Sequence, residues 1–189
     1  SLEIVKDMTK NCDKLNIAVC ELKNGTTVID CGVNVPGGYK AGEMVAKISF
    51  GGVGEAHVTH VTYEDLSIPT LIAYTDFPAK VLAQEPARVY KEIDYKDPCP
   101  DVAVLIVQPV ENALPDEKFA KLIVNKCKIN PENLYLVVTP TNSVTCSVQV
   151  SARGLEDNFA RLTEYYRMPY SSIEHALSST PISPISPKL

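Results

Sequence analysis

The segment Ile17-Ala18-Val19-Cys20-Glu21-Leu22-Lys23-Asn24-Gly25-Thr26-Thr27-Val28-Ile29-Asp30-Cys31 contains two apolar runs separated by an Asn-Gly pair. Asn and Gly both tolerate positive φ, which tight hairpin turns require. The segment therefore predicts a β-hairpin with strands over residues 17–22 and 26–31. This is the clearest local signal in the chain, and the other elements are placed relative to it.

The spacing of apolar residues on either side of the hairpin differs from that within it. Ile4, Val5, Met8, Cys12 and Leu15 recur at helical spacing, which predicts one amphipathic helix over residues 2–16. Beyond the hairpin we expect a glycine-rich loop, a helix over 43–50, and strands over 55–63 and 68–75. Pro69 favours an edge position or a strand start for the second of these strands. A short helix is expected after Asp76-Phe77-Pro78.

The second half of the chain alternates strands and helices. The apolar runs 102–107 and 134–138 predict two buried strands, the first covered on both faces. The segment Leu114-Pro115-Asp116-Glu117 predicts a helix start, and a turn is expected at 130–133. Apolar residues from Val144 to Tyr166 recur every three or four positions, which favours a long helix beginning near Ser143. Alternation over 144–150 leaves a strand there as the alternative.

These elements indicate an α+β protein with helices layered on sheet. The polar segment 92–100 contains two prolines and is the best candidate boundary between halves. We expect an N-terminal subdomain with a hairpin and antiparallel sheet over 1–97, and a β-α-β-α subdomain over 98–176. Residues 177–189 are rich in Pro and Ser and predict an extended or loose tail, since proline cannot continue a helix.

Composition excludes several classes of protein. The chain has 189 residues, 45% of them hydrophobic and 22% charged, which is typical of a globular protein of one domain or two small ones. The net charge of −5 argues against broad binding of nucleic acid phosphates. Neither an apolar run long enough for a membrane span nor a signal-peptide core is present. We expect a cytoplasmic protein.

The cysteines and histidines do not suggest a metal centre. The six cysteines are spread along the chain without a C-x-x-C pair, and no histidine lies beside them. We interpret them as buried thiols without disulfides. His57 and His60 are three residues apart on a predicted strand and point to opposite faces, so they cannot hold one metal ion together.

The most informative segment for function begins at Thr139-Pro140-Thr141-Asn142-Ser143, where a strand ends and a helix begins. Ligands often bind at such junctions. Further along the helix, Arg153 and Glu156 are three residues apart and share a face. By itself this spacing is more typical of a solvated ion pair. Gly154 between them is costly in a helix and suggests a close approach of some group to the backbone.

Several ordered blocks resemble the methenyltetrahydromethanopterin cyclohydrolase family. They include Asn24–Val33, Gly37-Gly38, Pro86-Ala87-Arg88, Leu114–Glu117 and the stretch from Pro131 to Arg153. The matching blocks extend in family order from about residue 15 to Thr180-Pro181-Ile182. Each block alone is a weak signal, but together they are specific.

The resemblance implies a soluble archaeal enzyme of one-carbon metabolism that interconverts the methenyl and formyl forms of tetrahydromethanopterin. It implies homo-oligomers, a pterin substrate, and no metal or redox cofactor. The S-A-R-x-x-E motif of the family falls on Arg153 and Glu156, which are the expected catalytic residues. The matching blocks and the helix start supply the candidate substrate-binding residues: Gly37, Gly38, Arg88, Thr141 and Ser143.

The chain also departs from the family pattern. Family members are longer and have additional residues ahead of Pro86-Ala87-Arg88, and Gln108 stands where the resemblance leads us to expect an acidic residue. Two alternatives to the enzyme therefore stay open. One is a non-catalytic paralog that binds a pterin or a protein partner. The other is a small interaction protein completed by oligomerisation.

Overall fold

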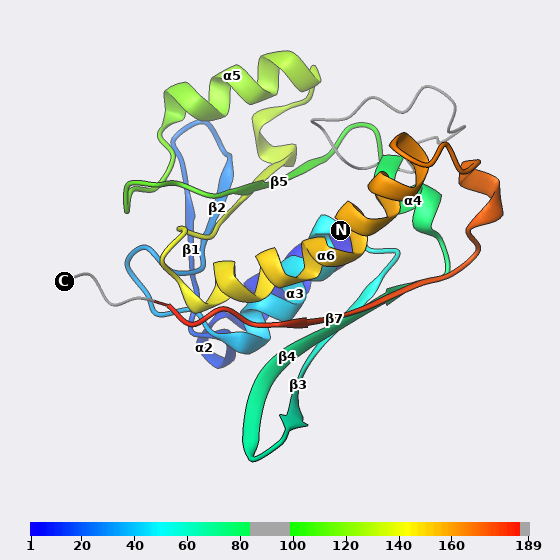
Figure 1. Ribbon diagram of the computed structural model, residues 1–189. Coiled ribbons are helices and arrows are strands. Elements are labelled where there is room, and N and C mark those ends of the chain that lie inside the picture. The colour runs from blue at the N-terminus through cyan, green and yellow to red at the C-terminus, as the bar shows by residue number, and fades with distance from the viewer. Residues whose placement is uncertain (84–98, 186–189) are drawn as a thin grey trace.

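The computed structural model describes residues 1–83 and 99–185, which form two sheets and the helices that cover them (Figure 1). The first sheet has the order β1-β2-β6-β5, and the second has the order β3-β4-β7. The strands are β1 (Ala18–Glu21), β2 (Thr27–Asp30), β3 (Glu55–Tyr63), β4 (Leu66–Thr75), β5 (Ala103–Val107), β6 (Leu134–Val138) and β7 (Ala176–Pro181). The helices are α1 (Leu2–Lys10), α2 (Cys12–Leu15), α3 (Tyr39–Ser49), α4 (Pro78–Ala83), α5 (Glu117–Cys127) and α6 (Val144–Glu164). Two short 3-10 turns cover Pro131–Asn133 and Tyr170–Ser172. This mixed content confirms the α+β prediction.

The first sheet is built around the predicted hairpin. β1 and β2 pair antiparallel, and Gly25 adopts φ +89 in the turn between them. β2 then pairs parallel with β6, which pairs parallel with β5. Sequence alone did not predict that the hairpin joins strands more than 70 residues further along the chain. As expected for strands of a buried parallel sheet, both faces of β2 and β6 are covered.

Successive residues of the strands in the first sheet point to opposite faces, and helices cover each face. On one face of the first sheet, Val28, Leu134 and Leu136 pack with Ala120 of α5. On the opposite face, Ile29 and Val137 pack with residues of α1 and α3. β5 packs on both faces as predicted, but it is only half-buried because it lies at the edge of the sheet.

The two long helices α3 and α6 lie together between the sheets (Figure 1). Ala46 and Phe50 pack with Leu71 of β4 and with Val148 and Leu155 of α6 in one fully or nearly buried cluster. At the helix crossing Gly42 has no side chain, and an added Cβ would lie 2.5 Å from Cβ of Val148. A glycine is therefore required for this close approach of α3 to α6.

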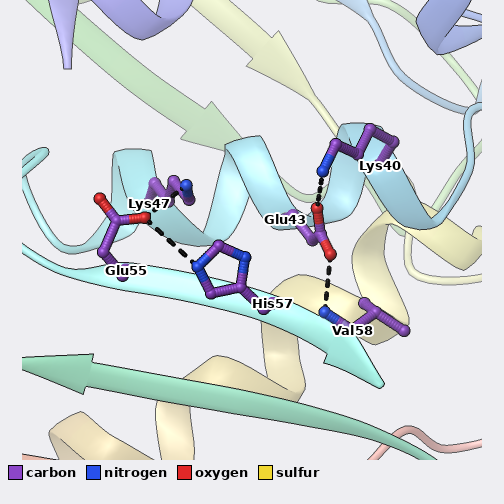
Figure 2. A network of polar contacts seen from close by, with 6 residues as sticks. All are labelled: Lys40, Glu43, Lys47, Glu55, His57 and Val58. Atoms are coloured by element: carbon purple, nitrogen blue, oxygen red, sulfur yellow. Dashed lines mark hydrogen bonds and ion pairs between the residues drawn. The ribbon is translucent and has the colours of Figure 1, made fainter. Parts of the chain in front are cut away.

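A buried carboxylate joins α3 to the second sheet (Figure 2). Glu43 is 7% exposed, and its Oε1 accepts a hydrogen bond of 2.6 Å from the backbone N–H of Val58 in β3. Its Oε2 lies 2.7 Å from Nζ of Lys40. On the exposed side of the same strand, Oε2 of Glu55 contacts Lys47 at 2.5 Å and Nε2 of His57 at 3.6 Å. Glu43 thus fixes where β3 meets α3.

Three local predictions are corrected by the structure. The helix predicted over 2–16 is interrupted at Asn11, whose φ of −116 and ψ of 25 leave the helical region, so two helices form. The helix predicted over 43–50 begins earlier, at Tyr39. Cys20, Cys99 and Cys127 are exposed, whereas Cys31 and Cys146 are the buried cysteines of the described residues.

The predicted tail is partly a strand. Residues 176–181 pair antiparallel with β4, so β4 is the central strand and Pro69 does not lie in an edge strand. The carbonyl of Pro69 accepts a hydrogen bond from Ile182, just beyond the last paired residues. Because the N–H and C=O of a residue in an antiparallel strand face the same neighbour, the missing N–H of Pro69 falls where this pairing ends.

Each sheet combines strands from both sides of the boundary predicted near residue 97. The boundary itself lies outside the described residues, so the division into 1–97 and 98–176 stays a prediction. The other predicted elements are confirmed. Asp116 caps α5 by accepting from the N–H of Phe119, and α6 begins after Ser143 as the helical pattern indicates. No helix among the described residues has the length and apolar character that a membrane crossing requires.

Candidate active site

The two expected catalytic residues lie on one face of α6. Arg153 is half-buried and Glu156 is only 7% exposed. Gln149 precedes them by one turn, so residues 149, 153 and 156 follow the i, i+4, i+7 spacing of a single helix face. The sequence contained this three-residue pattern, but only the Arg153–Glu156 pair was recognised in it.

These side chains line a cleft of about 260 Å³. The C-terminal end of α3, the strand β5 and the N-terminal residue form its other walls. This volume is near the lower end of pockets that bind small molecules, which range from roughly 300 to 1,000 Å³. The lining residues are Ser1, Ile48, Ser49, Val104, Leu105, Ile106, Gln108, Gln149, Arg153 and Glu156. The lining thus combines apolar side chains of β5 and α3 with an acid, a guanidinium and two amides.

The polar groups of the cleft suit acid–base chemistry. A buried carboxylate is costly unless charges or hydrogen bonds compensate for the lost water. A nearly buried ionisable group that lines a cleft is therefore a candidate for acting on a ligand. The side chain of Arg153, in the same cleft, supplies positive charge and several N–H donors. The cleft can thus bind a small polar molecule, accept a proton through Glu156, and donate hydrogen bonds through Arg153.

Gln108, the residue at the predicted departure from the family pattern, takes part in the cleft. It follows β5, and its Nε2 donates a hydrogen bond of 2.6 Å to Oε1 of Gln149. The same nitrogen lies 3.4 Å from Sγ of Cys146. Burial raises the pKa of the Cys146 thiol, while the neighbouring side chains of Thr139 and Gln108 act in the opposite direction. Gln149 is 5% exposed and was not singled out from the sequence.

Ser143 and Thr141 lie at the start of α6, away from the residues that line the cleft. The hydroxyl of Ser143 accepts a hydrogen bond from the N–H of Cys146 and donates one of 2.8 Å to the carbonyl of Pro140. Its hydrogen bonds therefore cap the helix. Thr141 is exposed and lines a separate hollow of about 300 Å³ with Ser147 and other residues. Cys146 lines that hollow and contacts Gln108, so it lies between the two cavities.

Gly37 and Gly38 lie at the N-terminus of α3. Gly37 has φ +63, a conformation that favours glycine. The N–H of Gly38 donates a hydrogen bond of 3.0 Å to Oγ1 of Thr145, which joins the start of α3 to the first turn of α6. Neither glycine lines the cleft. Arg88 lies outside the described residues, so its predicted role in substrate binding stays a prediction.

The unusual Gly154 has a structural explanation. A Cβ at this position would lie 2.8 Å from Oγ1 of Thr180 in β7. The group that approaches the helix backbone is thus a strand of this same chain. In the described ranges 1–83 and 99–185, no three His, Cys, Asp or Glu side chains gather closely enough to hold a metal ion.

The fold and the cleft define an α+β protein with a carboxylate and a guanidinium placed to bind a small polar molecule. The sequence profile of the cyclohydrolase (MCH) family matches residues 1–82 and 76–188, and the chain belongs to this family. It is 33% identical to the methenyltetrahydromethanopterin cyclohydrolase of Methanobrevibacter smithii over 208 aligned positions, which cover 95% of this chain. It is 34% identical to the Methanocaldococcus jannaschii protein of that name and 33% identical to the Methanothermobacter marburgensis protein, over 98% of the chain in both cases.

The chain is shorter than these relatives. The matched regions cover 64%, 65% and 66% of the three proteins, so the chain spans just under two thirds of their length. This finding agrees with the difference in length that the resemblance indicated. That this chain has the activity of these longer relatives is therefore a proposal.

Proposed function

We propose that this protein hydrolyses the methenyl bridge of methenyl-tetrahydromethanopterin to the formyl form, and that the reaction is reversible. The observation that supports this most directly is the position of Glu156, a nearly buried carboxylate that lines the same cleft as Arg153. Family membership supplies the substrate class, because the relatives have the name methenyltetrahydromethanopterin cyclohydrolase.

The substrate needs little activation. Its methenyl carbon lies between two nitrogens and shares their positive charge, so it is already electrophilic. Glu156 accepts a proton from a water molecule while the water oxygen forms a bond to this carbon. The resulting intermediate then breaks one carbon–nitrogen bond, and the departing nitrogen takes a proton from Glu156. The hydroxyl group of the intermediate loses its proton to solvent as this bond breaks and the carbonyl forms. The products are the formyl compound, one released proton and the regenerated carboxylate, so atoms and charges balance.

Arg153 modulates this step in two ways. Burial of Glu156 favours its protonated form, whereas the positive charge of Arg153 favours the carboxylate that must accept the proton. The guanidinium can also donate hydrogen bonds to the added oxygen, which gains negative charge as its protons are removed. Such stabilisation acts on the transition state more than on the bound substrate, and this difference increases the rate.

The proposed reaction needs no metal or redox cofactor, because only water and protons are transferred to an electrophilic carbon. A cytoplasmic location and a homo-oligomeric state remain part of this proposal. Nucleic acid and membranes are not among the proposed partners. A strictly monomeric protein in light scattering would contradict the oligomer.

The test is an absorbance assay with purified protein and methenyl-tetrahydromethanopterin. Loss of the methenyl absorbance should be faster than the spontaneous reaction. Glu156→Gln should lower the rate by at least about 10², the usual contribution of a positioned acid–base group. Asp157→Asn is the matched control, because Asp157 is an exposed acid at the next helix position. A rate no faster than the spontaneous one would refute the proposal.

The alternative is a non-catalytic protein that binds a pterin or a protein partner. The amide of Gln108 favours the pterin version, because an amide at this cleft position can form hydrogen bonds but cannot accept a proton as a carboxylate does. This alternative predicts an increase in Tm on addition of the pterin without turnover. The absorbance assay and a thermal shift on the same sample distinguish the two functions.

A further inference from the structure

The two amides in the cleft leave hydrogen-bonding groups unused. A primary amide has two N–H donors and one carbonyl acceptor. The side-chain nitrogen of Gln108 donates hydrogen bonds to Oε1 of Gln149 and to Sγ of Cys146. Among the described residues, no protein group binds the side-chain oxygen of Gln108 or the side-chain nitrogen of Gln149. One acceptor oxygen and one NH₂ group, with two N–H donors, thus remain on a pair of side chains that line the cleft.

This result does not depend on which atom of each amide is assigned as nitrogen and which as oxygen. In any hydrogen bond between two amides, one supplies its nitrogen and the other supplies its oxygen. The remaining groups are then an oxygen on the donating residue and an NH₂ on the accepting residue. The pair therefore always presents an acceptor beside a donor, which matches a ring edge of the form –NH–C(=O)–.

The unused donor of Gln149 stays accessible although the residue as a whole is nearly buried. The residue is 95% buried, since only 5% of its surface is exposed. A polar group that loses water without gaining a partner destabilises a protein. Among the described residues, the side-chain nitrogen of Gln149 is not one of the buried atoms without a partner. It therefore keeps some contact with solvent. The cleft that Gln149 lines is the space from which a ligand can reach it.

The pair is also well placed relative to the expected catalytic residues. Gln149, Arg153 and Glu156 lie along one face of α6, and a rise of 1.5 Å per residue places residues 149 and 156 about 10 Å apart along the axis. Side chains of this length extend several ångströms from the helix. A single bicyclic ring lying along the face can therefore contact the amide pair and the Arg153–Glu156 pair at the same time.

We propose that Gln108 and Gln149 bind the pyrimidinone edge of the pterin ring. One amide accepts from the ring N–H, and the other donates to the adjacent ring carbonyl. This inference rests on the proposed function for its ligand class. In a methenyl-tetrahydropterin the ring carbonyl is on the same side as the bridging carbon, so binding this edge directs the reacting carbon towards Arg153 and Glu156. The two glutamines thus select the ligand and orient it.

The test compares two stable ring compounds that lack the methenyl bridge. 6-Methylpterin has the –NH–C(=O)– edge, and 2-amino-6-methylpteridine lacks both the N–H and the oxygen. Ligand-observed NMR titration of the full chain should show about tenfold tighter binding of 6-methylpterin, the effect of about one to two neutral hydrogen bonds. In Gln108→Met and Gln149→Met, which preserve side-chain size, this preference should fall to within about twofold.

The ratio separates recognition from a purely structural role. If the glutamines only join β5 to α6, the substitutions weaken binding of both compounds equally and leave the preference unchanged. Asn158→Met is the matched control, because Asn158 is an exposed amide on the same helix and does not line the cleft. It should keep the wild-type preference. Gln149→Glu keeps size and an acceptor but lacks the donor, so it should also reduce the preference if a methionine variant fails to fold.

The inference is overturned if the wild-type protein binds the two compounds equally, or binds neither, or if the glutamine variants retain the preference. This outcome is distinct from failure of the proposed reaction. A protein that prefers 6-methylpterin through the two glutamines but does not hydrolyse the methenyl compound refutes the hydrolase and supports this inference. A protein that hydrolyses the methenyl compound but binds both ring compounds equally supports the hydrolase and refutes this inference.

Discussion

Gly42→Ala tests whether the close approach of α3 to α6 determines the stability of the fold. An added Cβ would lie 2.5 Å from Cβ of Val148, and 2.8 and 3.1 Å from its two methyl carbons. Ordinary contacts of such atoms begin at 3.4 Å. The helices would therefore have to separate by about 1 Å at a point where both are buried and closely packed.

The expected magnitude is the balance of two effects. Overpacking a core typically costs about 1–3 kcal/mol, and three atoms of Val148 within reach of the new methyl group favour the upper end. Alanine stabilises a helix by about 1 kcal/mol relative to glycine. We expect a net loss of about 2 kcal/mol in the free energy of unfolding. For a domain of this size, that corresponds to a decrease in Tm of about 4–8 °C.

Urea unfolding followed by circular dichroism measures this loss. Gly38→Ala is the control, because nothing lies within 4 Å of a Cβ added at Gly38. Because Gly38 is the N-cap of α3, this variant should still cost about 1 kcal/mol or less, the usual effect of a weaker capping residue. A double-mutant cycle with Val148→Ala should show that Gly42→Ala costs less once the two methyl groups are absent. Equal or greater stability of Gly42→Ala, or strict additivity in the cycle, would refute the packing argument.

Two further predictions concern buried groups. Burial, followed by the charge of Asp30, raises the pKa of Cys31 from 9.0 to about 12, so the folded protein keeps its thiol proton while the unfolded chain loses it. The contribution of Cys31 to the free energy of unfolding is therefore fully present below pH 9. It should be lost as pH rises from 9 towards 12, by about 1.4 kcal/mol per pH unit. In urea unfolding, Cys31→Ala should lose less of this free energy between pH 8 and 10 than the unchanged protein. Glu43→Ala should cost about 2–3 kcal/mol because it leaves the N–H of Val58 without its acceptor. Lys40→Ala should cost less than about 1 kcal/mol, since the Lys40 side chain is 73% exposed. Equal losses for these two variants would contradict the view that the hydrogen bond from Val58 to Glu43 stabilises the contact of α3 with β3 more than the ion pair does.

The elements that sequence predicted well depend on contacts within a few residues. The Asn24-Gly25 turn, the capping residue Asp116 and the start of α6 after Ser143 all follow from local backbone preferences. The Arg153–Glu156 pair belongs to this group, because the helical period alone places both side chains on one face. The resemblance to a family, and not the spacing, leads us to expect that the pair is catalytic. The spacing alone is more typical of a solvated ion pair.

The contacts that sequence could not predict join segments far apart in the chain. β2 pairs with β6 across more than 100 residues, and the Pro- and Ser-rich segment 176–181 completes the second sheet beside β4. The hydrogen bond between Gln108 and Gln149 depends on how β5 and α6 are positioned by these sheets. No local preference specifies such pairs, because their stability comes from burial summed over the whole core.

Sequence by itself determined the helix face that bears Gln149, Arg153 and Glu156, since the spacing of residues along a helix is set by backbone geometry. Only the tertiary structure decided that this face is closed into a cleft by β5, Ser1 and the end of α3. The same packing places Thr180 of β7 against Gly154. The reason is physical: local geometry orients a side chain, but the distant segments that surround it determine what it can bind.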